Sequence, residues 1–137
     1  MRITNRRHRG FTLIEVMIAM VIIGILTSVA WSAYERQTTK NRRVEGVRAL
    51  MEASSLMEKC YVNNNNTYQD CTIPATSERG HYGLSLGHTD ATEDYTLTAT
   101  AQNAQAGDAE CTTLVINHLG QRSHTGTAAL ARRCWVE

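Results

Sequence analysis

The sequence predicts an α+β chain in which one long N-terminal helix, apolar in its first half, packs through its second half on a small antiparallel sheet. An apolar run occupies residues 11–34, where 18 of 24 residues are hydrophobic, against 42% for the whole chain of 137 residues. A charged segment with helical spacing of apolar residues follows, and then short stretches of alternating apolar and polar residues. At most one small domain follows the apolar run, because typical domains contain roughly 100–150 residues.

Residues 1–10 form a basic stub without acidic residues. Four of the 14 lysines and arginines lie there, so residues 11–137 carry ten cations against 13 acidic residues. Bulk charge therefore does not indicate a protein that binds polyanions over its whole surface. Arginines in front of an apolar segment favour a cytoplasmic N-terminus.

The apolar run is long enough to cross a membrane. As a helix, residues 11–34 extend about 36 Å, against a hydrocarbon core of about 30 Å. A secretory signal peptide fits poorly, because its apolar region usually has about 7–15 residues and its cleavage site follows that region. Here the small residue at the junction of basic and apolar sequence is Gly10, which precedes the run. Cleavage at Gly10 would leave the apolar helix on the mature protein.

Helical character continues through residues 35–62, which are amphipathic. The apolar residues near one face are Val47, Leu50, Met57 and Cys60. The charged residues, mostly on other faces, are Glu35, Arg36, Arg43, Glu45, Arg48, Glu52 and Glu58. We therefore expect one helix over about 12–61, with Gly46 as its weak position and the asparagine run 63–66 as its end.

Residues 63–137 predict a loop-rich head with a small antiparallel sheet. Three segments alternate as half-buried strands do. The residues that share a face are Tyr82, Leu84 and Leu86, then Tyr95, Leu97, Ala99 and Ala101, then Leu114 and Ile116. Gly120 predicts a turn into a fourth strand over residues 122–125. The simplest assembly packs this sheet on the helix.

Four cysteines behind a candidate membrane span indicate an oxidising compartment. The predicted core contains many alanines, and small folds of this kind usually need covalent support. Three pairings are possible. We favour Cys60–Cys71, which closes the loop where the helix ends, and Cys111–Cys134, which ties the last strands to the C-terminal tail.

The N-terminal sequence resembles a known family. GFTLIEVMI at residues 10–18, continued by IIGIL at residues 22–26, resembles the processing motif of type IV pilins and pseudopilins. The order of helix, loop, sheet and C-terminal cysteine loop resembles a type IVa pilin head. Among these proteins the chain is most similar to minor pilins of the PilE type. One departure is that Ser32 stands where the family often has a proline, and the chain's one proline is Pro74.

The resemblance implies processing and assembly. A prepilin peptidase would cut between Gly10 and Phe11 and methylate the new amine of Phe11. Glu15 would pair with the Phe11 amine of a neighbouring subunit, because a carboxylate in hydrocarbon needs a partner. The subunit would pass from the inner membrane, N-terminus cytoplasmic and head periplasmic, into an extracellular pilus. Inner-membrane machinery and other pilin subunits would be its partners.

Two alternative functions remain open. Arg122, Arg132 and Arg133 make the C-terminal loop locally basic, as expected if the chain were a DNA-binding competence pilin. A type II secretion pseudopilin would place calcium in the head, and the candidate acidic residues are Asp90, Glu93, Asp94 and Asp108. We expect no enzyme, no cofactor and no metal site, since nucleophile, phosphate-loop and zinc signatures are missing from the sequence.

Overall fold

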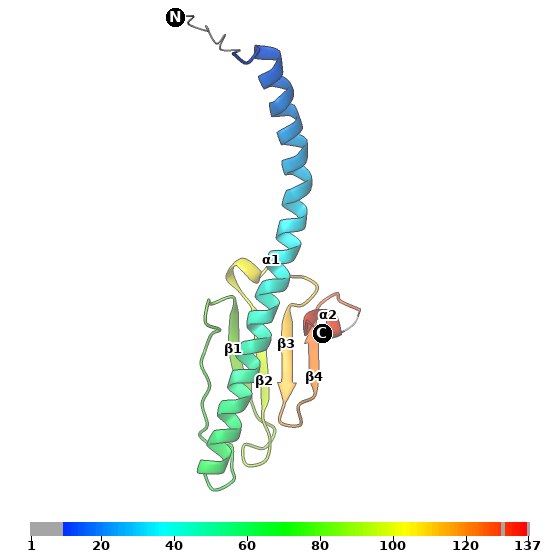
Figure 1. Ribbon diagram of the computed structural model, residues 1–137. Coiled ribbons are helices and arrows are strands. Elements are labelled where there is room, and N and C mark those ends of the chain that lie inside the picture. Colours follow the sequence, from blue (N-terminus) through cyan, green and yellow to red (C-terminus); the bar gives the residue numbers. More distant parts are fainter. Residues whose placement is uncertain (1–9, 130, 137) are drawn as a thin grey trace, which may run out of the picture. The chain divides into compact units, whose positions relative to one another are not determined.

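The computed structural model describes residues 10–129 and 131–136 (Figure 1). The chain divides into two units, one ending at Arg36 and the other beginning at Gln37. The predicted leader, residues 1–10, lies outside the described residues apart from Gly10. The segmentation into residues 1–10, 11–34, 35–62 and 63–137 remains a prediction.

The helix α1 is continuous from Leu13 to Asn63, close to the expected range. It begins after Thr12, whose hydroxyl oxygen accepts the backbone N–H of Glu15 at 3.3 Å and so caps the first turn. It ends in a turn where Asn65 and Asn66 adopt positive φ angles, a conformation that asparagine tolerates better than most residues. The helix is uninterrupted at Ser32, where the family often has proline.

The second unit contains a four-stranded antiparallel sheet in the order β1-β2-β3-β4. Its strands are β1 (Tyr82–Gly87), β2 (Thr96–Ala101), β3 (Thr113–Asn117) and β4 (Arg122–Thr125). Each strand pairs with the next in the chain, as in Leu84 with Ala99 and Ala99 with Leu114. The part of α1 in this unit runs across one face of the sheet (Figure 1). The α+β architecture expected from the sequence is therefore confirmed.

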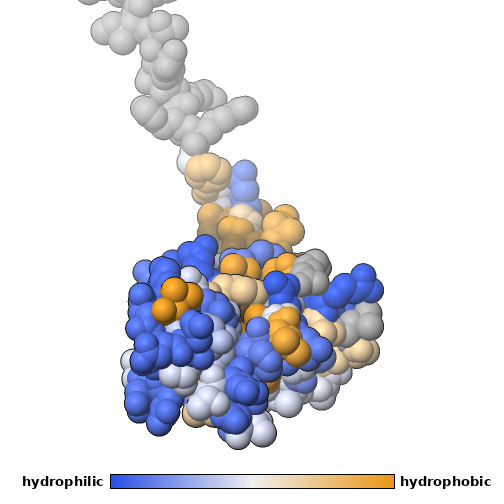
Figure 2. All heavy atoms as spheres, turned by 90° about the horizontal axis from the view of Figure 1, so that it is seen from below, coloured by the Kyte–Doolittle hydropathy of each residue, from blue (hydrophilic) through white to orange (hydrophobic). Residues whose placement is uncertain are grey.

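The core lies between α1 and the sheet. Its fully buried large side chains include Leu50 and Met57 from α1 and Leu97 and Leu114 from the strands. The predicted alternation holds best in β2 and β3, where Leu97, Ala99, Leu114 and Ile116 are buried. In β1 only Tyr82 is fully enclosed. The face of this unit shown in Figure 2 is largely hydrophilic, with apolar side chains in small separate groups.

Two disulfides join segments of this unit, Cys60 with Cys71 and Cys111 with Cys134. Two short helices complete it: the 3-10 turn η1 (Asn103–Gln105) and α2 (Ala131–Cys134). Neither was expected from the sequence, because helices of three and four residues are too short to show a periodic pattern.

Candidate functional site

The first unit exposes its apolar side chains completely. Every described residue from 10 to 36 is exposed, and Phe11 is 83% exposed. By length and composition, α1 is the one described helix that could cross a membrane. The large aliphatic side chains exposed on this part of α1 are Leu13, Ile14, Val16, Met17, Ile18, Met20, Val21, Ile22, Ile23, Ile25, Leu26 and Val29. Such a surface needs lipid or other helices around it.

Glu15 lies in the first turn of α1, the one acidic residue on this apolar surface. The positive end of the helix dipole favours a carboxylate there. Gly10 and Phe11 precede the helix, and the space around Gly10 is open. The three residues of the predicted processing and assembly site thus lie together at the N-terminal end of α1.

The three C-terminal arginines lie on two neighbouring elements. Arg122 begins β4, and Arg132 and Arg133 are exposed on α2. The guanidinium carbon of Arg122 lies 5.2 Å from the ring centre of Trp135, which favours a cation–π contact. The Trp135 indole N–H donates to the carbonyl oxygen of Ser123 at 3.0 Å, so α2 is fixed beside β4. The structure therefore brings the predicted DNA-contact residues to one region of the head.

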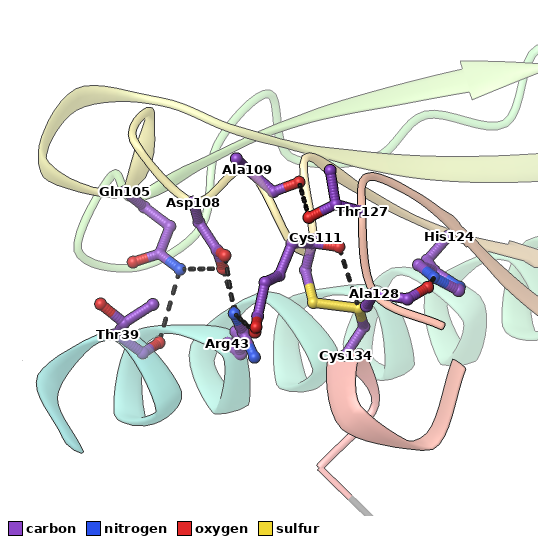
Figure 3. Close-up of polar contacts among 11 residues, drawn as sticks. Thr39, Arg43, Gln105, Asp108, Ala109, Cys111, His124, Thr127, Ala128 and Cys134 are labelled. Atoms are coloured by element: carbon purple, nitrogen blue, oxygen red, sulfur yellow. Dashed lines mark hydrogen bonds and ion pairs between the residues drawn. A yellow bond between two sulfur atoms is a disulfide. The ribbon is translucent and has the colours of Figure 1, made fainter. Parts of the chain in front are cut away.

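A buried ion cluster lies between α1 and the connection from β2 to β3 (Figure 3). Arg43 donates through Nε and Nη2 to the two carboxylate oxygens of Asp108 at 2.7 and 2.6 Å, and through Nη2 to Glu110 at 2.9 Å. The side chains of Arg43 and Asp108 are 6% and 3% exposed. Hydrogen bonding to Asp108 is the largest cause that raises the pKa of Arg43, outweighing its burial.

The structure differs from the sequence analysis at two residues of this cluster. Arg43 is one of the charged residues expected mostly on other faces than the packed one, and Asp108 is a candidate calcium ligand only in the alternative of a secretion pseudopilin. Instead each is the other's buried partner, and Gln105 donates a further hydrogen bond to Asp108 at 2.8 Å. Because Arg43 and Asp108 are 65 positions apart, no local sequence signal connects them.

A second polar cluster holds the loop that leads into β1. The Glu45 carboxylate accepts from the Ser77 hydroxyl at 2.5 Å and the Arg79 backbone N–H at 3.0 Å, and it lies 2.6 Å from Nδ1 of His81. Burial raises the pKa of Glu45, but the hydrogen bonds from Ser77, His81 and Arg79 together lower it below its usual value. The Glu45 side chain therefore links α1 to this loop.

The acidic loop between β1 and β2 uses its carboxylates for its own backbone. Asp94 accepts the N–H groups of Thr89 and Asp90 at 2.8 and 3.1 Å, and Asp90 accepts both donors of Thr92. These bonds lower the pKa values of Asp90 and Asp94. Residues 10–129 and 131–136 contain no group of three or more histidines, cysteines or acidic residues close enough together to hold a metal ion.

The fold and the exposed apolar N-terminal half of the helix define a class of protein, the type IV pilins. A model of the prokaryotic N-terminal methylation motif matches residues 5–31. A second family model, described as type IV minor pilin ComP, DNA uptake sequence receptor, matches residues 32–115, which is more than half of the chain. The chain belongs to this ComP family of type IV minor pilins.

Curated relatives agree with the assignment. The type IV major pilin protein PilE1 of Neisseria gonorrhoeae is 34% identical over 83 residues, covering 57% of this chain and 50% of that protein. A fimbrial protein of Neisseria meningitidis is 37% identical over 88 residues, covering 60% of this chain and 51% of that protein. The chain thus spans about half the length of these relatives. Pilin family proteins are structural subunits.

Among solved structures, the non-core minor pilin PilV of Neisseria meningitidis has the same fold. It aligns with a TM-score of 0.55 and 18% identity over 69% of this chain and 94% of that one. The prediction of a type IV pilin with a long helix, an antiparallel sheet and the Cys111–Cys134 disulfide is confirmed.

Proposed function

We propose that this chain is a minor subunit of a type IV pilus that is matured at its N-terminus and held in the filament through α1. A prepilin peptidase cuts between Gly10 and Phe11 and methylates the Phe11 amine. Before assembly the subunit lies in the inner membrane with a cytoplasmic N-terminus and a periplasmic head. Assembly machinery then moves it into the filament. The methylation motif over residues 5–31 and the exposed apolar half of α1 support this order of events.

The observation that carries the proposal is Glu15, the lone charge between Phe11 and Tyr34. A charged residue costs about 3 kcal/mol at the centre of a membrane helix and less near its end, where Glu15 lies. Pairing with the free amine of Phe11 on a neighbouring subunit offsets this cost and links cleavage to assembly, because the amine exists only after cleavage. Attraction between the two charges in a low-dielectric core also sets the axial position of one subunit against the next.

The experiment compares the wild type with Glu15→Ala and with Glu35→Ala as a matched control that loses an acid outside the apolar run. Intact mass and N-terminal sequencing are measured on protein from its own membranes, and sheared filaments are probed for the subunit. We expect all three chains to begin at methylated Phe11, with only Glu15→Ala missing from filaments. An uncut chain beginning at Met1, or normal incorporation of Glu15→Ala, would contradict the proposal.

A second function, DNA capture by the head, is favoured by the match to the DNA uptake sequence receptor family and by the exposed Arg132 and Arg133 beside Arg122. The head as a whole does not attract DNA by charge, because residues 37–137 contain nine lysines and arginines against 11 acidic residues. Contact is therefore local, through a few phosphates, and sensitive to salt.

DNA capture is tested by replacing Arg122, Arg132 and Arg133 with glutamine. The matched control replaces Arg48, Lys59 and Arg79, three exposed cations elsewhere on the head, and changes the net charge equally. Retention on immobilised duplex DNA is measured across a salt series. We expect the C-terminal variant alone to lose retention, with a salt slope smaller by about 0.9 for each phosphate contact removed. Equal losses of DNA retention in the two variants would contradict the proposal, because net charge alone would then explain the binding.

A further inference from the structure

The C-terminal segment is held by β4, through Trp135, and by the end of the β2–β3 connection, residues 108–111, which we call the bracket. The Thr127 backbone N–H and hydroxyl donate to the carbonyl oxygen of Ala109 at 2.9 and 3.3 Å. The Ala128 N–H donates to the carbonyl oxygen of Glu110 at 3.1 Å. The Cys111–Cys134 disulfide joins the bracket to α2. The placement of α2 therefore depends on the bracket as well as on β4.

Backbone packing makes this contact close. Gly126 has a φ of +134°, and a Cβ there would overlap the carbonyl group of Glu110. Nε2 of His124 lies 3.1 Å from the carbonyl oxygen of Ala128, which closes the turn that follows β4 (Figure 3). The segment after β4 thus lies directly on the bracket, with no side chain between them at residue 126.

The bracket is in turn held to α1 by Arg43, which contacts Asp108 at the first position of the bracket (Figure 3). Arg43 also contacts Glu110 at the third position. The neighbouring Arg42 donates instead to the carbonyl oxygen of Ala104 at 2.7 Å, in the η1 turn before the bracket. Two adjacent arginines on one helix therefore hold different parts of the same connection. Of these two arginines, Arg43 hydrogen-bonds to the bracket and Arg42 to the turn before it, so Arg42 provides a matched control.

We propose that Arg43 is a positioning residue for the C-terminal surface. Through Asp108 and Glu110 it sets where the bracket lies, and the bracket sets where α2 presents Arg132 and Arg133. A planar guanidinium can hold both oxygens of Asp108 and still reach Glu110, which a lysine ammonium does not reproduce. The expected effect on DNA retention rests on the DNA capture proposed above. The role of Arg43 in positioning α2 does not depend on that proposal.

The test uses the full-length chain in detergent with Trp31→Phe, which leaves Trp135 as its one tryptophan. Arg43→Met is combined with Asp108→Leu, so that no buried charge is left without its partner. Arg42→Gln is the control. Acrylamide quenching of Trp135 emission reports the position of α2, and amide hydrogen exchange reports β1, β2 and residues 126–129. Retention on duplex DNA is measured on the same samples.

We expect the double variant to show severalfold stronger quenching of Trp135, faster exchange at residues 126–129 and severalfold weaker DNA retention. Protection of β1 and β2 stays as in the parent chain, and Arg42→Gln behaves like the parent. Unchanged quenching in the double variant overturns the proposal. Equal loss of protection in β1 and β2 also overturns it, since the cluster would then support the core generally. If the parent chain retains no DNA, DNA capture fails, and the quenching and exchange still decide the role of Arg43.

Discussion

The ring of Tyr82 lies directly on the backbone of α1 at Gly46, where an added Cβ would stand 2.9 Å from Cε2 of that ring. Tyr82 is fully buried at the start of β1. The glycine that is expected to weaken the helix is therefore a place where the sheet packs directly against the helix backbone. Glycine lowers the stability of the helix here, but a larger residue would not leave room for the Tyr82 ring.

Gly46→Ala tests this relationship. Alanine is favoured over glycine inside a helix by about 1 kcal/mol. Overpacking a core typically costs about 1–3 kcal/mol, and Tyr82 has no exposed side toward which to move. We expect net destabilisation, measured as a lower urea midpoint. Gly107→Ala, at a glycine with open space around it, serves as the control, and a Gly46→Ala chain more stable than the wild type would contradict the prediction.

Glu45 makes the stability of the head depend on pH in the acidic range. Its folded-state pKa lies below the usual value of 4.5, so its contribution is present in full above that pH. The contribution is lost as pH falls from 4.5 through the folded pKa, because in that range the unfolded state is protonated at Glu45 while the folded state is still ionised. We expect urea unfolding of Glu45→Gln to show a smaller loss of stability below pH 4.5 than the wild type. Glu52→Gln, which removes an exposed acid from the same helix, is the control for the change in net charge.

The two disulfides should stabilise the head by similar amounts and in different places. Loops of 11 and 23 residues correspond to about 3 kcal/mol each in the chain-entropy model. Replacing either pair with serine should lower the free energy of unfolding by about that amount, measured in urea. Only the Cys111→Ser, Cys134→Ser chain should also expose Trp135 to a quencher. Exposure of Trp135 in the Cys60→Ser, Cys71→Ser chain would contradict the local assignment.

Gly126→Ala should be more damaging than Gly120→Ala. Both glycines have positive φ angles, but an added Cβ overlaps the Glu110 carbonyl group only at residue 126, while residue 120 has open space. Backbone strain costs about 1–3 kcal/mol, and the φ of +134° at residue 126 is less accessible to alanine than the +73° at residue 120, so strain and overlap both make Gly126→Ala the more destabilising change. Equal losses in the two variants would mean that the segment after β4 can move off the bracket at little cost.

Much of the fold was predictable because its signals are local. The apolar run and the helical spacing after it predicted α1 to within two residues at either end, and Gly120 with the residues after it predicted β4 over its observed range. Alternation predicted the buried faces of β2 and β3. β1 matched less well, because Leu84 and Leu86 lie only half-buried near the edge of the sheet.

The sequence by itself determined the class of the protein, since residues 10–18, which include Gly10, Phe11 and Glu15, form a continuous motif at the start of the apolar run. Only the tertiary structure decided which charged residues are buried. Arg43 and Glu45 fall among other charged positions of one helix, and nothing near them in the chain distinguishes them from Arg48 or Glu52. Burial of a charge is stable only with a hydrogen-bonding partner, and those partners, Asp108 for Arg43 and residues 77–81 for Glu45, reach the helix only when the chain has folded.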